Sequence, residues 1–234
     1  MIQANCRAQF TADDFSFVVR VLAKSQRDAV SLVSLLSDEA ERDAILDHDL
    51  IYDSVVDSVG CLQVSAAFYF YILTRRVLRR ALLDERALTD YVAAVLLAFA
   101  KTSQLRAPGD QTPTSRSFSY ISDLMTQAGK CPPEQAFVLR VHTANYALFL
   151  SGMFAERVHA HVQRRGAPNL GFYEAVGQST YLSVADHPQA RRTELQDIFR
   201  LLGGEFRRVR VALNTLADTL LHLHETPSIL IRPT

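Results

Sequence analysis

The sequence predicts an all-α fold, a bundle of about eight to ten helices with no significant sheet. Apolar residues recur with the 3.6-residue period of a helix in every long segment, and no segment sustains the alternation of a half-buried strand. The composition, 48% hydrophobic and 21% charged, is typical of a packed globular chain. We treat residues 1–234 as one all-helical domain. Residues 104–116, rich in Pro, Gly, Ser and Thr, are either a boundary between two subdomains or a loop within one.

The first helix is expected to begin after Thr11, whose hydroxyl can cap it, with Asp13 and Asp14 at the positive end of the helix dipole. Its apolar face follows the i, i+3, i+4, i+7 pattern of an amphipathic helix. That face consists of Phe15, Val18, Val19 and Leu22. Further helices in the first half are expected at 28–36, in short acidic pieces between 38 and 59, at 61–83 after a break at Gly60, and after Asp84.

In the second half of the chain, prolines and glycines delimit the expected helices. A long helix begins at the pair Pro132-Pro133 and is expected to bend near Gly152. The pair Gly203-Gly204 is expected to end another helix, which begins at Pro188. The helices of this half are expected at 118–127, 133–165, 172–185, 188–202 and from 206 onward.

The last helix has the clearest pattern, with six large apolar residues spaced alternately three and four apart as in a heptad seam. Val211, Ala217 and Leu221 lie off this seam, and a helix that is apolar on more than one side usually contacts more than one neighbour. Because the seam is short for an autonomous coiled coil, ordinary core packing is one interpretation of it; the other, which we carry forward as a hypothesis, is a homodimer through the C-terminal helix. The heptad seam consists of Phe206, Val209, Leu213, Leu216, Leu220 and Leu223.

Charge is balanced overall, with 25 basic and 25 acidic residues, so the molecule lacks a long-range attraction for nucleic acid. Residues 11–60 nevertheless hold 11 acidic and 4 basic side chains, a net charge of −7. Four arginines form a cationic stripe on two successive helical turns. We predict that this stripe pairs with the chain's own acidic segment and does not bind nucleic acid. The stripe consists of Arg75, Arg76, Arg79 and Arg80.

Cysteine usage and hydropathy indicate a cytoplasmic location. Cys6, Cys61 and Cys131 are far apart and form no CxxC pair, so they suggest neither a disulfide framework nor a cysteine zinc site. The first ten residues lack the apolar core of a signal peptide. The uninterrupted apolar stretches reach only about half the length of a membrane span. We expect a soluble cytoplasmic protein that contacts no membrane.

Two short patterns raise the question of metal binding. His48-Asp49 resembles the paired ligands of the HD phosphohydrolases, but that family also places a histidine upstream, and none precedes His48. A polar turn between acidic helices explains this pair. Glu156 and His159 have the i, i+3 spacing of a metal-binding pair, but no second ExxH occurs. We identify no metal ligands and no cofactor.

The string Gly203-Gly204-Glu205-Phe206 is similar to the GGDEF motif of diguanylate cyclases. It lacks one acidic residue, and the family's motif lies on a hairpin between strands, whereas here the string joins two amphipathic helices. We interpret it as a helix end followed by a helix start. The sequence contains no Gly-rich phosphate loop, GxSxG elbow or HExxH motif, so we identify no catalytic residues.

Three polar residues, His142, Asn145 and Tyr146, lie within the apolar stretch 137–154. Buried polar groups need partners, so these residues either brace neighbouring helices or line a pocket. The leading expectation is a non-enzymatic helical protein-interaction or regulatory module that self-associates or binds another protein. The alternative is a small-molecule-binding or metal-dependent helical enzyme with a polar pocket around His142.

Overall fold

The computed structural model describes residues 2–57, 64–101, 117–165 and 168–225. Within these ranges the regular structure is entirely helical, which confirms the all-α prediction. The described residues form twelve α-helices and one short 3-10 helix, slightly more than the eight to ten helices expected. In chain order they are η1 (Arg7–Gln9), α1 (Ala12–Leu22), α2 (Gln26–Leu36), α3 (Glu39–Leu46), α4 (Asp49–Asp57), α5 (Ala66–Arg80), α6 (Arg86–Lys101), α7 (Ser117–Ala128), α8 (Pro133–Met153), α9 (Ala155–Arg165), α10 (Leu170–Ala185), α11 (Pro188–Arg192) and α12 (Gln196–Glu225).

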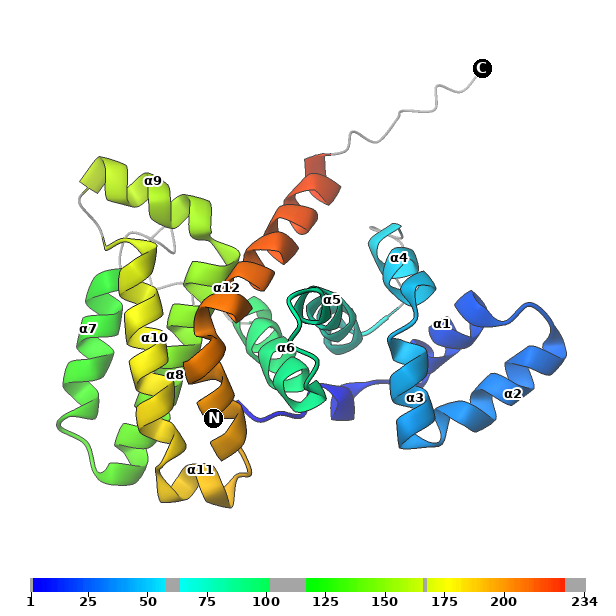
Figure 1. Ribbon diagram of the computed structural model, residues 1–234, viewed down its shortest axis with the longest axis horizontal. Helices are drawn as coiled ribbons and strands as arrows, with labels where there is room; N and C mark the ends of the chain where they lie inside the picture. Colours follow the sequence, from blue (N-terminus) through cyan, green and yellow to red (C-terminus); the bar gives the residue numbers. More distant parts are fainter. Residues whose placement is uncertain (1, 58–63, 102–116, 166–167, 226–234) are drawn as a thin grey trace.

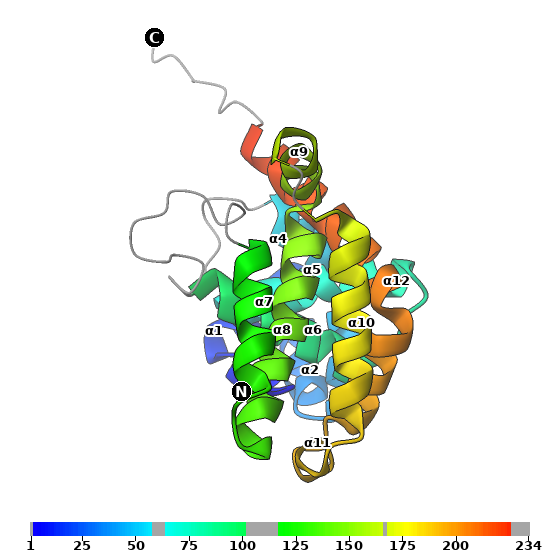
Figure 2. The ribbon, with the colours of Figure 1, turned by 90° about the vertical axis from the view of Figure 1, so that its left-hand side faces the viewer.

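The helices form two groups joined by a central pair (Figure 1). Helices α1 to α4 lie at one end of the molecule, and α7 to α11 lie at the other. Between them, α5 packs against α6, α4 and α12, so the central pair contacts both groups. In the second group α8 lies between α7 and α10 (Figure 2), and α12 packs on both α8 and α10. None of the described helices is both long enough and apolar enough to span a membrane.

The first helix begins where the sequence predicts. The hydroxyl of Thr11 accepts a hydrogen bond from the backbone N–H of Asp14 at 3.3 Å, and the Asp14 carboxylate accepts one from the backbone N–H of Thr11 at 2.7 Å. Asp14 is fully buried and also accepts hydrogen bonds from the backbone N–H and the hydroxyl of Ser65, at 2.6 and 2.7 Å. Because Ser65 caps α5, one carboxylate connects the starts of α1 and α5.

The bundle of α8, α10 and α12 is packed so closely that glycine is required at two crossings. A Cβ atom at Gly177 of α10 would lie 2.1 Å from Cε2 of Phe206 on α12. A Cβ atom at Gly152 of α8 would lie 2.9 Å from the Cβ atom of Leu213, also on α12. Folded interiors tolerate no contacts this short, so a larger residue at either position would push the helices apart.

Three predicted helix boundaries differ in the structure. The bend expected near Gly152 is a break at Phe154, which separates α8 from α9. The helix expected from Pro188 to 202 is interrupted at Glu194, whose backbone has a φ of 56°. The helix end expected at Gly203-Gly204 lies at Glu205 instead, where non-helical backbone (φ −107°, ψ 16°) forms a kink between the two helical segments of α12.

Gly203, two residues before this kink, also allows close packing between α12 and α10. A Cβ atom there would lie 2.6 Å from the side chain of Leu182 on α10, whereas a Cβ atom at Gly204 would meet no atom within 4 Å. The expected linker at 104–116, the break at Gly60 and residues 61–63 of the expected apolar helix lie outside the described residues.

The first four positions of the heptad seam, from Phe206 to Leu216, are fully buried inside the chain's own core. Leu220 is half-buried, and the side chains of Leu221 and Leu223 lie outside the described part of the chain. The sequence left open whether the seam is core or dimer contact. For these four positions it is core, because α8 and α10 already cover them.

Candidate functional site

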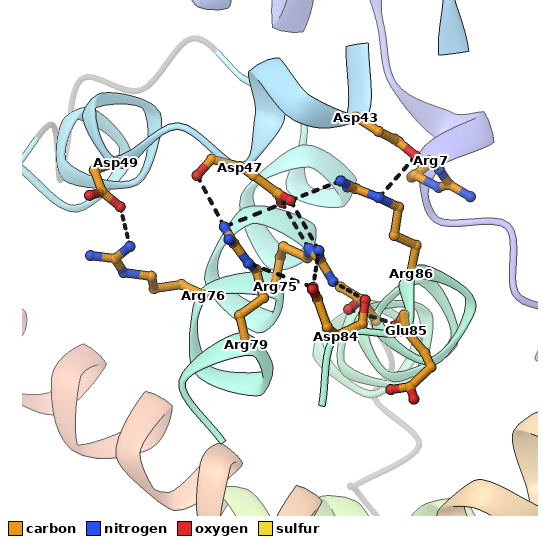
Figure 3. Close-up of polar contacts among 11 residues, drawn as sticks. Arg7, Asp43, Asp47, Asp49, Arg75, Arg76, Arg79, Asp84, Glu85 and Arg86 are labelled. Atoms are coloured by element: carbon orange, nitrogen blue, oxygen red, sulfur yellow. Dashed lines mark hydrogen bonds and ion pairs between the residues drawn. The ribbon is translucent and has the colours of Figure 1, made fainter. Parts of the chain in front are cut away.

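Arg75 lies at the centre of an ionic junction between the first group of helices and the central pair (Figure 3). Its almost fully buried guanidinium donates from Nε and Nη2 to the two carboxylate oxygens of Asp47, at 2.8 and 3.0 Å. It also donates to the backbone carbonyl oxygen of Asp84 at 2.8 Å and to the Asp84 carboxylate. The arginine–aspartate junction, as we name it, consists of Arg7, Asp43, Asp47, Asp49, Arg75, Arg76, Arg79, Asp84 and Arg86.

Asp47, the residue that follows α3, is the acceptor that three arginines share. Besides Arg75, the guanidinium of Arg86 donates to it at 2.8 Å, and that of Arg79 lies 3.7 Å away. Burial alone would raise the pKa of Asp47, but the hydrogen bond and charge of Arg75 and the charges of Arg86 and Arg79 outweigh it. The pKa of Asp47 therefore lies below its ordinary value.

A second pair of carboxylates extends the junction toward the N-terminus. Nη1 of Arg7 donates to both oxygens of Asp43 at 3.0 Å, and Nε of Arg86 lies 3.2 Å from Asp43. The backbone N–H of Arg7 donates to Asp90 at 2.7 Å. Burial raises the pKa of Asp90, and the hydrogen bond and charge of Arg7 offset only part of this effect. The junction thus fastens η1 and α3 to α5 and α6.

Of the remaining stripe arginines, Arg76 contacts α4. Arg76 donates to the carboxylate of Asp49, and its guanidinium lies 5.2 Å from the ring centre of Tyr52. The predicted pairing of the stripe with the chain's own acidic segment is therefore confirmed for Arg75, Arg76 and Arg79. Arg80 is exposed and borders a polar hollow of about 510 Å³. Because Asp47 and Asp49 also line this hollow, its arginine charge is largely balanced.

The two candidate metal patterns have structural explanations. Nδ1 of His48 accepts a hydrogen bond from the backbone N–H of Leu50 at 3.2 Å, so His48-Asp49 forms the predicted polar turn between α3 and α4. Glu156 and His159 are exposed on α9. Among the residues that the structure describes, no three His, Cys, Asp or Glu side chains gather in a way that could hold a metal ion.

Asn145 braces three helices. It is buried on α8, and its Oδ1 accepts hydrogen bonds from the hydroxyl of Tyr91 on α6 at 2.9 Å and from that of Tyr181 on α10 at 2.6 Å. Burial raises the pKa of both phenols, so both remain protonated donors at neutral pH. Of the two alternatives for this residue, bracing is therefore the correct one.

His142 and Tyr146 belong to an aromatic stack between α6 and α8. The ring of His142 stacks on Phe99 at 5.7 Å and on Tyr146 at 6.4 Å between centres, and Phe99 stacks on Phe149 at 4.8 Å. Burial lowers the pKa of His142, so its imidazole is neutral at pH 7. The side chain thus packs as an aromatic ring in this part of the core.

A second hollow, apolar and about 550 Å³ in volume, lies between α1 and α2. Phe15 and Val19, both half-buried, form its α1 wall, and Val33 of α2, which is 58% exposed, forms part of the other. Val30, about one turn from Val33, is 66% exposed. The α1–α2 groove, as we name this hollow, is lined by Ala12, Phe15, Ser16, Val19, Arg20, Val33, Leu36 and Ser37.

The groove lies on a part of the fold that little else covers. Helix α2 packs on α1 and α3, and Figure 1 shows the α1–α2 hairpin at the end of the molecule farthest from the bundle. Of the apolar face predicted for the first helix, Val18 is fully buried, whereas Phe15 and Val19 line the groove. Contiguous exposed apolar surface of this kind is typical of protein-interaction sites.

The sequence contains a signal for this groove that a search for chemical motifs misses. The apolar residues of α2 surround the helix instead of forming one stripe, which indicates more than one neighbour. The same criterion drew attention to the C-terminal helix. In α2 these residues are Val30, Leu32, Val33, Leu35 and Leu36, with only serines between them.

Comparisons of the chain with protein-family models, with curated proteins and with solved structures find no match. Function must therefore be argued from the chain's own geometry. The carboxylates of the arginine–aspartate junction are paired with arginines of the same chain, and Oδ1 of Asn145 accepts hydrogen bonds from Tyr91 and Tyr181. The α1–α2 groove is an open apolar hollow of about 550 Å³ with two exposed valines, Val30 and Val33, at its edge.

Proposed function

We propose that this chain is a non-enzymatic helical protein-interaction module that self-associates, and that the α1–α2 groove is the contact surface. The observation that carries the proposal is the exposure of Val30 and Val33 beside an open apolar groove. Leaving these side chains in water forgoes roughly 1 to 2 kcal/mol each that burial against a partner would recover. A partner surface that covers the groove is thus favoured by the hydrophobic effect.

We propose that the homodimer expected through the C-terminal helix forms through the α1–α2 groove instead. The buried part of the heptad seam is already covered within the chain, so it has no surface left for a partner. Among the described side chains of α12, Val211 is the large apolar residue that remains exposed, at 47%. A single valine is a small anchor for a stable contact, whereas the groove offers both walls and the ridge of Val30 and Val33.

A second copy of the chain is the occupant that we favour. Between Ala29 and Ser37 the α2 helix carries no charged residue, so two such faces can meet without burying like charges. A two-fold contact of this kind is self-complementary and closes after two subunits, as most homodimers do. It needs no partner other than the chain itself.

The test replaces the two exposed valines together, Val30→Asp with Val33→Asp. Neither side chain is part of the core, so the variant should keep the helical content and thermal stability of the wild type. We expect the wild type, of 26.2 kDa per chain, to scatter light as a dimer at roughly 50 µM. The double variant should scatter as a monomer at the same concentration, because a buried unpaired carboxylate is strongly unfavourable.

The matched control is Val211→Asp, which places the same charge on the exposed side of α12. This variant should remain a dimer. Splitting of the dimer by Val211→Asp alone would return the contact to the C-terminal helix. A wild type that stays monomeric, or a double-valine variant that stays dimeric, would contradict the proposal.

The alternative function, a small-molecule-binding or metal-dependent helical enzyme around His142, has one observation in its favour. Burial keeps the imidazole of His142 neutral, which is the form that can accept a proton or bind a metal. Against it, the carbonyl oxygen of the neighbouring Asn145 is engaged by Tyr91 and Tyr181. Stoichiometric iron, manganese or zinc in the purified protein would favour this alternative over the interaction module.

A further inference from the structure

We infer that two copies of this chain pair their α1–α2 hairpins antiparallel about a two-fold axis, forming a four-helix bundle across the interface. This inference rests on the proposed function and adds the orientation of the partner to it. The groove is half of such a bundle, because α1 and α2 supply two adjacent helices whose shared apolar side is open. The ridge of the partner's second helix would fill it.

The shapes of the two hairpins are complementary. Phe15 and Val19 line a concave surface, and Val30 projects beside it. In a two-fold arrangement each copy's Val30 and Val33 can enter the groove of the other, and both insertions are equivalent. The groove of one copy is therefore incomplete without a residue from the second copy.

The charges at the two ends of the hairpin select the antiparallel orientation. The tip, where α1 connects to α2, carries three exposed basic residues, Arg20, Lys24 and Arg27. The base, where α1 begins and α2 ends, carries the exposed acids Asp13 and Asp38. Antiparallel pairing sets each basic tip against an acidic base, whereas parallel pairing would set tip against tip and base against base.

One acid near the tip does not weaken this complementarity. Asp28 lies about 160° around α2 from Val30, on the side away from the groove, because residues two apart are separated by about 200° on a helix. Arg27, three residues before Val30, lies on the same side as Val30. The charge that faces a partner at the tip is therefore basic.

A charge-swap experiment tests the orientation. The tip variant carries Lys24→Glu with Arg27→Glu, and the base variant carries Asp13→Lys with Ser37→Lys. All four positions are exposed, and the Thr11–Asp14 capping box is untouched. Each variant alone should dimerise roughly tenfold more weakly than the wild type, because the tip and the base that meet in its dimer then carry net charges of the same sign.

An equimolar mixture of the two variants should recover wild-type dimer affinity. In the mixed dimer, one contact pairs the reversed tip with the reversed base, and the other pairs the two unchanged ends, so both contacts are attractive again. Native mass spectrometry identifies the mixed dimer by its mass. One chain carrying all four substitutions should also recover the homodimer.

The outcomes separate this inference from the proposed function. If the wild type is a dimer that Val30→Asp with Val33→Asp splits, but the tip and base variants alone dimerise as tightly as the wild type or their mixture shows no recovery, the antiparallel orientation is wrong and the interaction surface stands. If the wild type is monomeric, the proposed function itself fails. Circular dichroism melting of each variant within a few degrees of the wild type shows that a weaker dimer does not reflect unfolding.

Discussion

In the bundle of α8, α10 and α12, the helices approach closely at glycines, which have no side chain: Phe206 packs against Gly177, and Leu213 packs against Gly152. At the opposite end of the molecule, α3 is fastened to α5 and α6 by arginines and aspartates. In the bundle the exposed large apolar residues Val138, Leu182 and Val211 lie one on each of the three helices, with no apolar groove identified beside them in the described residues. The ionic attachment leaves the apolar residues of α1 and α2 available, which is why we place function at that end.

The largest expected effect tests the ionic side of this comparison. Asp47→Ala leaves the buried guanidinium of Arg75 without its main partner, and we expect a loss of about 3 to 5 kcal/mol in the free energy of unfolding. Asp49→Ala is the control, because that carboxylate is 67% exposed and its pair with Arg76 should contribute only about 0.5 kcal/mol. Urea unfolding of both variants measures the difference. Equal losses would show that burial of Arg75 is unimportant.

The packing side is tested by two glycine substitutions. Gly177→Ala forces a Cβ atom against the ring of Phe206 and should destabilise the fold by roughly 2 to 3 kcal/mol. Gly204→Ala meets no neighbouring atom and should be neutral or stabilise the helix by up to about 1 kcal/mol. Thermal unfolding compares them. A Gly177→Ala variant as stable as the wild type would mean that the bundle can separate its helices at little cost.

The pH dependence of stability should reflect the junction and not the bundle. The pKa of Asp47 lies below its ordinary value of 3.8, so its ionised form stabilises the fold above that pH, and this stabilisation is lost as the pH falls through the lowered pKa. Asp90, whose pKa is raised, has the opposite sign and relieves part of the loss on protonation.

We therefore expect Asp47→Asn to flatten the decline in the free energy of unfolding below about pH 4, and Asp90→Asn to steepen it. Urea titrations at pH 5, 4 and 3 measure both slopes. Parallel slopes for the wild type and Asp47→Asn would contradict the assignment of acid sensitivity to the junction.

The smallest expected effect concerns backbone strain in the loop between α5 and α6. Leu82, which connects α5 to α6, has a φ of 58° and is 83% exposed. Leu82→Gly removes a Cβ atom from this left-handed conformation and should stabilise the fold by about 1 kcal/mol. A loss of stability on thermal unfolding would show that the exposed leucine makes a contact that outweighs the strain.

The sequence predicted most of the helices because caps and apolar periodicity are local signals, as at Thr11 and along α1. It located the break between two helical segments to within a residue or two at Gly203-Gly204, but it could not show that Gly203 also packs against the side chain of Leu182 on α10. The charge balance of the sequence predicted that the arginine stripe pairs with the acidic segment. It did not identify Asp47 as the carboxylate that three arginines share. Nothing local distinguishes Asp47 from the other acids of its segment.

The groove illustrates the same limit. Phe15 and Val19 have the spacing of a core-facing stripe. They line an open surface because of the path of α2, which the sequence does not show. The seam in α12 has the spacing of a dimer contact, and only α8 and α10 decide that it is core. A periodic apolar pattern identifies the face of a helix that makes contacts. The tertiary fold determines whether a helix of the same chain or a partner makes them.

Hydrogen–deuterium exchange at low and high protein concentration tests the central claim most directly, because it locates the self-association surface without any substitution. If copies pair through the α1–α2 groove, backbone amides in Ala12–Leu22 and Gln26–Leu36 should exchange more slowly in the concentrated sample. Amides of α12 around Val211 should exchange at the same rate in both samples. Slower exchange confined to α12, with α1 and α2 unchanged, would contradict the account.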